Sequence, residues 1–169
     1  AADLASSLDD LFPRIHSIIS QVMPAGNFYI ALTSPRKGYL SLPYYVDEMD
    51  EAPEGEQSEN GLTHHVLHKG RALICDESMQ NDLVERGVVD AVGSPSKVWL
   101  GVPLIVDGSA IGVMVVQHYQ DPLAYGKREQ RMLEFVSSQV ALVIKRKQAE
   151  DALRASEENF RGLFENTPL

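Results

Sequence analysis

Residues 98–118 read VWLGVPLIVDGSAIGVMVVQH, and this stretch decides the fold class. Two apolar runs, at residues 98–106 and 110–118, are joined by Asp107-Gly108, a dipeptide typical of tight hairpin turns. Side chains alternate between the two faces of a strand, and in both runs the two alternating sets are apolar. A hairpin with one face in water would carry polar residues at every second position. We therefore expect an antiparallel sheet that other elements cover on both faces.

The chain before this hairpin predicts a helix and then a second hairpin. Apolar residues recur at helical spacing from Leu8 to Val22, with Ser7 or Asp10 as the cap. Pro13 fits best in a first turn, which places the start of the regular helix near Asp10. Further along the chain, the expected elements are strands at 28–32 and 39–42, a helix at 61–68 capped by Asn60, a strand at 72–75 and a helix near 79–86.

The last segment is expected to be helical from about Lys127, with two apolar stripes. One stripe, made of Leu133, Val136, Val140 and Val143, can lie on the sheet. The other keeps a four-three spacing and is a candidate coiled-coil seam, the alternative being accidental spacing on an exposed helix. Its members are Met132, Phe135, Gln139, Leu142, Arg146, Ala149, Leu153, Ser156, Phe160 and Leu163. Because Phe160, Leu163 and Phe164 would have no cover from this chain, we expect it to be part of a longer protein.

The charge of the chain is concentrated in one segment. The 169 residues carry 15 Lys plus Arg against 24 Asp plus Glu, a net charge of −9. Seven acids and no base lie within residues 47–59, where Pro53 and Gly55 interrupt any regular period. This segment is expected to be a solvated loop over one edge of the fold, with a lid over a ligand as the alternative.

Composition excludes several classes of partner. Nucleic-acid binding rests mainly on clustered Lys and Arg, so an acidic chain is expected to bind neither DNA nor RNA. No apolar run approaches the roughly 18 residues of a membrane span, and no secretion signal begins the sequence. With a single cysteine, no internal disulfide can form. We therefore expect a cytoplasmic domain without direct membrane contact.

Motifs for catalysis are not evident in the sequence. It contains no glycine-rich loop followed by Lys, no Gly-x-Ser-x-Gly and no Cys-x-x-Cys. His64 and His68 share a helix face at a metal-ligand spacing, but with only His65 beside them no third ligand is evident, and no metal is expected. Cys75 is expected to be an inert core thiol, because burial and the neighbouring Asp76 both raise a thiol pKa.

Trp99 marks the candidate ligand-binding face of the sheet. We assign Gly101 and Gly112 to the same face, where their missing side chains leave room for a ligand that Trp99 could contact. The alternative is that Trp99 is ordinary core. Asp76 either caps the following helix or touches a ligand; the sequence leaves both open.

Taken together, these segments resemble the GAF domains, small-molecule-sensing modules of signalling proteins. The resemblance runs from about Leu8 to Arg146 and is carried by NFYIAL at 27–32, GLT at 61–63, GR at 70–71, LICD at 73–76, WLGVPL at 99–104, IGVMV at 111–115, Phe135 and QVA at 139–141. It implies an α+β fold with a six-stranded antiparallel sheet, the terminal helices on one side and a ligand pocket on the other. Residues 156–161, SEENFR, and 163–166, LFEN, resemble the opening helix of a PAS domain.

Departures from the family patterns limit which ligand is implied. Bilin-binding relatives use a Cys followed by His, whereas Cys75 is followed by Asp76. The Asn-Lys…Phe-Asp constellation of the cyclic-nucleotide branch is not found. Relatives that reduce free methionine sulfoxide use several cysteines, and one cysteine cannot form the disulfide of that cycle. The cofactor or ligand is therefore left unknown.

The resemblance implies a GAF sensor domain at residues 1–146, and a linker helix with the start of a truncated PAS domain at 147–169. The expected function is a non-catalytic small-molecule sensor that forms a homodimer through its terminal helices and relays ligand state to downstream domains. The implied parent is a signalling protein such as a sensor histidine kinase of a two-component system or a cyclic-dinucleotide enzyme. The candidate ligand-binding residues are Tyr29, Leu62, Thr63, Asp76 and Trp99. The alternative is a purely structural dimerisation module without a ligand.

Overall fold

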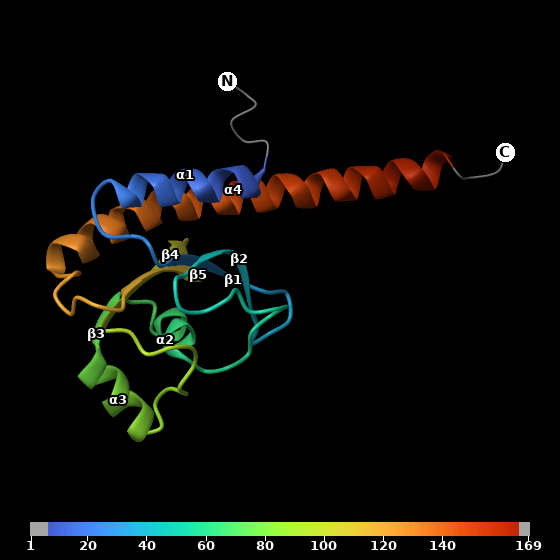
Figure 1. Ribbon diagram of the computed structural model, residues 1–169. Coiled ribbons are helices and arrows are strands. Elements are labelled where there is room, and N and C mark those ends of the chain that lie inside the picture. Colours follow the sequence, from blue (N-terminus) through green and yellow to red (C-terminus); the bar gives the residue numbers. More distant parts are fainter. Residues whose placement is uncertain (1–6, 166–169) are drawn as a thin grey trace.

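The computed structural model describes residues 7–165, with one antiparallel sheet between two layers of helices (Figure 1). The five strands have the order β2-β1-β5-β4-β3. Their bounds are β1 Phe28–Thr33, β2 Leu40–Val46, β3 Leu73–Asp76, β4 Val98–Val106 and β5 Ser109–His118. Every pairing between them is antiparallel, as the sequence predicts.

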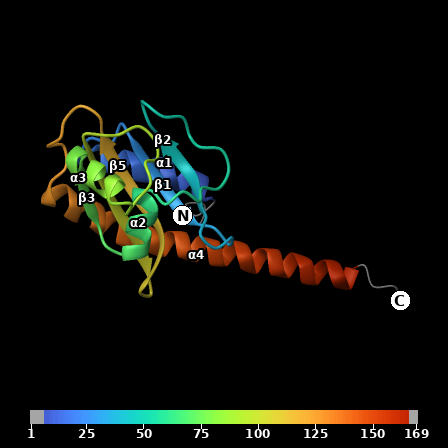
Figure 2. The same ribbon diagram turned by 90° about the horizontal axis from the view of Figure 1, so that it is seen from below.

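Four helices cover the sheet. Helices α1 (Leu8–Ser20) and α4 (Lys127–Glu165) lie on one face, while α2 (Leu62–Lys69) and α3 (Glu77–Glu85) lie on the other. Figure 2 shows the same division from below, with α2 and α3 on the side of the sheet away from α4. No helix in residues 7–165 combines the length and the apolar character that crossing a bilayer requires.

The two apolar sets of the β4–β5 hairpin separate as their parity predicts. Val98, Leu100 and Met114 pack in the core beneath α1 and α4. Trp99 and Val113 pack in a second core beneath α2. At the turn, Asp107 and Gly108 both have positive φ, at 51° and 77°, as a type I′ turn requires. The prediction that both faces of the sheet are covered is confirmed.

The sheet has five strands, so the expectation of six is wrong. The segment between β2 and α2 contributes only an isolated bridge, in which Leu40 and Gln57 exchange two backbone hydrogen bonds of 2.8 and 2.7 Å. Pro53 and Gly55 precede Gln57, and the surrounding acidic side chains are exposed. Carboxylates that stay in water and a proline without an N–H do not favour an extended ladder, so pairing stops after one bridge.

Several boundaries differ from the predictions because caps decide them. Helix α1 begins at Leu8 because the Ser7 side chain accepts a hydrogen bond from the Asp10 backbone nitrogen, and Pro13 lies beyond the first turn. The cap of α2 is Gly61, while the Asn60 side chain donates to the Val88 carbonyl instead. Gly70 ends α2 in the left-handed conformation, as predicted.

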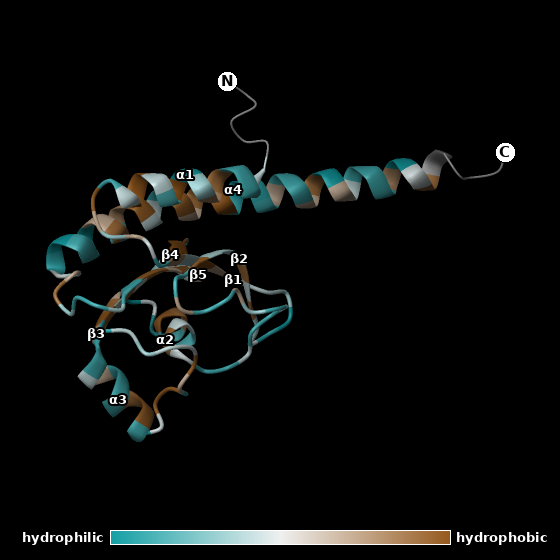
Figure 3. Cartoon of the chain, viewed as in Figure 1, coloured by the Kyte–Doolittle hydropathy of each residue, from teal (hydrophilic) through white to brown (hydrophobic). Residues whose placement is uncertain are grey.

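Helix α4 uses one side to pack and projects beyond the rest of the molecule (Figure 1). Leu133 and Val140 are buried and Val136 is half-buried against the sheet core, which confirms three members of the predicted packing stripe. The fourth, Val143, is half-buried outside this core, and Ile144 takes its place. Ala141 and Ile144 are buried there as well. In the projecting half, separate apolar bands interrupt an otherwise polar helix (Figure 3). In this half, the side chains of residues 148–161 are all exposed.

Candidate functional site

A cavity of about 650 Å³ lies on the face of the sheet that is turned away from α4. Its floor comes from the strands, through Tyr29 of β1, Trp99 of β4 and Gln117 of β5. Helices α2 and α3 contribute two further parts of the lining, and residues 89–95 with parts of the acidic segment complete it. The volume is in the range of small-molecule sites in proteins.

Aromatic rings dominate the floor of the cavity. The Tyr29 and Tyr45 rings stack with centroids 5.2 Å apart. The Tyr29 hydroxyl lies 2.8 Å from Thr63 Oγ1, and the Trp99 indole nitrogen donates to the Tyr29 hydroxyl at 3.4 Å. These contacts join β1, β2, β4 and the first turn of α2, so side chains from four elements hold the floor in one geometry.

Burial keeps the phenol groups of the floor protonated. It raises the pKa of Tyr29 and of Tyr45, and the nearby negative charge of Asp47 adds to both shifts. Asp47 itself accepts hydrogen bonds from the Gln117 side chain and from the Tyr119 hydroxyl, each at 2.9 Å. The floor is therefore a neutral aromatic surface with a fixed carboxylate close to it.

His64 is the buried polar group of the cavity lining without a complete set of partners. It is 8% exposed, and its Nε2 has no hydrogen-bond partner among residues 7–165. Burial lowers its pKa, and the charge on a protonated His68 would lower it further, which outweighs the opposing contributions of Gly38 and Glu59. At neutral pH His64 is thus a neutral imidazole.

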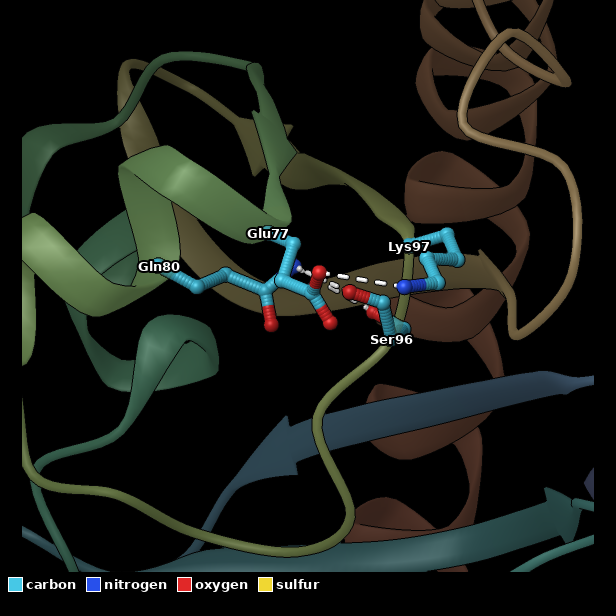
Figure 4. A network of polar contacts seen from close by, with 4 residues as sticks. All are labelled: Glu77, Gln80, Ser96 and Lys97. Atoms are coloured by element: carbon cyan, nitrogen blue, oxygen red, sulfur yellow. Dashed lines mark hydrogen bonds and ion pairs between the residues drawn. The ribbon is translucent and has the colours of Figure 1, made fainter.

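A polar network fixes α3 to the chain that leads into β4 (Figure 4). The Gln80 side-chain nitrogen donates to the Ser96 carbonyl and to the Cys75 carbonyl, both at 3.1 Å. Lys97 and Glu77 form an ion pair at 3.1 Å beside it. Gln80 also lines the cavity, so this network places the α3 side of the cavity relative to the sheet.

The structure brings together four of the five candidate ligand-binding residues. Tyr29, Leu62, Thr63 and Trp99 all line the cavity. Asp76 is not part of the lining: it is exposed, and its carboxylate accepts a hydrogen bond from the Met79 backbone nitrogen at 2.8 Å as the cap of α3.

Gly101 and Gly112 do not provide the room for a ligand that the sequence predicts. The Trp99 indole itself covers Gly101, so that a Cβ at Gly101 would collide with the ring. Gly112 pairs with Leu104 and belongs to the face under α1 and α4, where a Cβ would meet the Ala31 carbonyl. The assignment of Gly112 to the Trp99 face was wrong, because its parity places it with Met114.

Sequence reasoning missed Tyr45, His64 and Gln117 as parts of the lining. Tyr45 is paired with Tyr29 in the β1–β2 register, but the sequence prediction ended that strand at Leu42, before Pro43. β2 is an edge strand, where a proline can be accommodated. Parity continued from Leu42 would have selected Tyr44 instead. A register shift between Ile30 and Leu32 breaks the alternation, so Tyr45 shares the cavity face with Leu42 while Tyr44 packs in the opposite core.

Other candidate chemistry lies outside the cavity. Cys75 is completely buried, and burial together with the charge of Asp76 raises its pKa to about 12. Within residues 7–165, no group of three or more His, Cys, Asp or Glu side chains is arranged to hold a metal ion.

The fold and the cavity together define an α+β domain whose sheet carries a ligand-sized hollow on one face and a long helix on the other. The model of the GAF domain family matches residues 5–145 of the chain. The chain therefore belongs to the GAF domain family. A comparison with curated protein sequences gives no match.

Several solved structures share the fold of this chain. The chain is similar to the GAF domain/HD domain protein from Geobacter sulfurreducens, with 13% identity over 88% of this chain and 99% of that chain and a TM-score of 0.64. It is also similar to the GAF domain of a two-component sensor histidine kinase from Bacillus halodurans, with 14% identity, 86% and 98% coverage and a TM-score of 0.66. A type II free methionine-R-sulfoxide reductase from Thermoplasma acidophilum matches with 16% identity, 85% and 96% coverage and a TM-score of 0.66.

Proposed function

We propose that the chain is a non-catalytic sensor module, which binds a small molecule in the cavity, forms a homodimer and passes ligand state along α4 to downstream domains. Membership of the GAF family, whose domains are sensory and regulatory modules of signalling proteins, supports a role in signalling. The observation that carries the proposal is the position of the cavity. It lies on one face of β4, and α4 packs on the other face of the same strand.

This arrangement gives ligand binding a short mechanical path to α4. Trp99 contributes to the cavity floor, while its neighbours Val98 and Leu100 point into the core shared with α4 residues such as Leu133. A ligand that binds one position of Trp99 better than another biases the strand, and the strand biases the helix that packs on it. The proposed ligand contacts are Tyr29, Leu62, Thr63 and Trp99, with Asp76 acting through the position of α3.

The exposed stripe of α4 supports dimerisation. Phe135 is 69%, Leu142 58% and Leu153 61% exposed, all on the side of the helix opposite the buried Leu133 and Ile144. Large apolar side chains at four-three spacing on a polar helix are typical of a coiled-coil seam. Two copies that pair along this stripe would hold their α4 helices parallel and in register.

We propose the same division of the chain that its sequence suggests: a sensor domain at residues 1–146 and, at 147–169, a linker helix leading into a PAS domain. Residues 156–165 continue α4 without a break, and Asn166 of the PAS-like motif lies outside the described residues. The parent protein would be a sensor histidine kinase or a cyclic-dinucleotide enzyme.

Thermal unfolding with a broad panel of nucleotides and metabolites tests ligand binding. A ligand at a hundred times its dissociation constant stabilises the folded state by about 2.7 kcal/mol. No stabilisation across the panel would favour the alternative of a structural dimerisation module. The open cavity of about 650 Å³ speaks against that alternative, which needs a pocket filled by the protein's own side chains.

An enzyme acting through Cys75 is the third hypothesis, and alkylation separates it from the other two. With a pKa of about 12 and a completely buried side chain, the native thiol should react with iodoacetamide only as fast as the protein opens. Rapid native labelling, at the rate found in denaturing urea, would support the enzyme instead.

A further inference from the structure

The charged groups around the cavity all carry the same sign. Five carboxylates belong to the lining: Asp50, Glu51, Glu59, Glu85 and Asp90. Among the described residues of the lining there is no Lys and no Arg. Ligands with phosphate or carboxylate groups are bound mainly by these two side chains, so the cavity lacks the groups that an anion requires.

The carboxylates stand where a ligand would enter. Glu51, Glu59, Glu85 and Asp90 are exposed and yet belong to the lining, which places them at the open side of the cavity. Asp50 differs, because its carboxylate is held by two hydrogen bonds from Ser94. An approaching cation would thus meet a negative potential before it reaches the floor.

The floor of the cavity also suits a cation. Of its three rings, Tyr29 and Trp99 are buried, and the half-buried Tyr45 offers the most accessible aromatic surface. An ammonium group within about 6 Å of a ring centroid is attracted by the ring quadrupole. Asp47, which is hydrogen-bonded to Gln117 of the lining, adds a carboxylate close to these rings.

His64 is a buried polar residue of the cavity lining, and one of its ring nitrogens is unpaired among the described residues. It lines the same cavity, is 8% exposed, and its Nε2 has no partner among residues 7–165. A buried ring nitrogen without a partner costs free energy. Because Nε2 has no surface accessible to solvent, a ligand N–H reaches it only if the imidazole turns toward the cavity.

We propose that the cavity binds an organic cation, an ammonium group carried on an apolar or aromatic body. The inference rests on the proposed function in so far as the cavity must take a ligand at all. The aromatic floor would receive the body, and the carboxylates at the open side would receive the charge. A volume of about 650 Å³ leaves room for an aromatic amine with its side chain.

Three probes with one ring system and different charge test the proposal on the full chain of 169 residues. Tryptamine is a cation at neutral pH, tryptophol is neutral, and indole-3-propionate is an anion. Isothermal titration calorimetry at low salt should show tryptamine binding at least about tenfold more tightly than tryptophol, with indole-3-propionate weakest. Added salt should reduce the preference for tryptamine, because the carboxylates at the open side are exposed to solvent.

A pair of double variants with equal change of net charge shows whether the preference is local. Glu59→Gln with Glu85→Gln neutralises the cavity mouth, and Glu150→Gln with Glu158→Gln neutralises exposed carboxylates of α4. The first pair should weaken tryptamine binding about threefold or more, while the second should leave it unchanged. Equal weakening by both pairs would overturn the proposal, since it would show only the field of an acidic protein.

The other outcomes separate the two proposals. Equal affinity for tryptamine and tryptophol, or a preference for indole-3-propionate, would overturn the proposal of a cationic ligand. Either result would still support a ligand-binding cavity. If none of the three probes binds, the proposal of a cationic ligand is overturned. The metabolite panel then decides alone whether the cavity binds a ligand.

Discussion

Asp50 accepts two hydrogen bonds from Ser94, one from its backbone nitrogen at 2.8 Å and one from its hydroxyl at 2.6 Å. The two residues are 44 positions apart and join the acidic segment to the chain that leads into β4. Both line the cavity, so this contact closes one side of it. The neighbouring Gly93 has φ 74°, and a Cβ there would lie 3.1 Å from an Asp50 carboxylate oxygen.

Ser94→Ala should loosen this side of the cavity without unfolding the protein. It removes the hydroxyl donor and leaves the backbone hydrogen bond, so the free energy of unfolding should fall by about 1 kcal/mol. Hydrogen exchange should become faster in residues 49–57 and 89–95, and urea unfolding gives the stability. Ser58→Ala, at an exposed serine of the acidic segment, is the control and should change neither the hydrogen exchange nor the stability. Unchanged exchange in Ser94→Ala would show that the contact does not hold the two segments together.

Gly101→Ala tests how the Trp99 indole is placed. A Cβ at Gly101 would lie closer to the ring than real Cβ atoms come to their neighbours, so the indole must shift away from β4. Overpacking of this kind costs about 1–3 kcal/mol, and the tryptophan emission spectrum should change because Trp99 is the single tryptophan. Gly26→Ala is the matched control, since a Cβ there has nothing within 4 Å. An unaltered emission spectrum in Gly101→Ala would contradict the packing of Trp99 over Gly101.

The fold was predictable wherever a sequence pattern has only one structural explanation. Apolar parity in the β4–β5 hairpin predicted two covered faces, and the glycine at position 70 predicted the end of α2. Strand number was not predictable in this way, because it depends on whether a single bridge at Gln57 extends into a ladder. The acidic residues around Gln57 are compatible both with a long loop and with the end of a short strand. The sequence therefore does not decide between a single bridge and a ladder.

Four residues of the candidate site were predictable: Trp99 from the parity of its strand, and Tyr29, Leu62 and Thr63 from the resemblance to GAF domains. Tyr29 and Trp99 lie in strands whose apolar runs and parity were evident, whereas Asp50 and Asp90 come from irregular segments that have no period. Nothing in the sequence brings residues 50 and 94 together; only the folded chain does. The role of Asp76 was left open between cap and ligand contact, and the Met79 hydrogen bond identifies the cap.

Alkaline pH should destabilise the protein in a window that begins near pH 9. Cys75 has a pKa of about 12 when folded against 9.0 for the unperturbed thiol, so the unfolded chain loses its proton first. Above about pH 9 the unfolded state binds fewer protons than the folded state, and stability falls by up to about 1.4 kcal/mol per pH unit. Unfolded tyrosine titrates near pH 10, so the tyrosines whose pKa burial raises add to the loss of stability between pH 9 and 10. They are the same in the native chain and in a Cys75 variant, so a comparison of the two isolates the thiol.

Urea unfolding of the native chain and of Cys75→Ala at successive pH values checks this. The variant is expected to be less stable at neutral pH because Cys75 fills a core position, so the slope against pH and not the absolute stability is compared. The native slope between pH 9 and 10 should be steeper than that of the variant. Parallel curves would mean that the thiol of the folded protein titrates normally.

Replacing Leu142 and Leu153 by Asp should break the proposed dimer. Both leucines are exposed in the single chain, at 58% and 61%, and in a seam each would gain about 1.5–3 kcal/mol from burial. Two carboxylates from each copy would instead face each other across the seam. Gln148→Asp with Ala155→Asp is the control, because these exposed positions lie on α4 outside the stripe and add the same number of negative charges. Sedimentation velocity should show a dimer for the native chain and the control and a monomer for the leucine variant, and an unchanged mass in the leucine variant would refute pairing through this stripe.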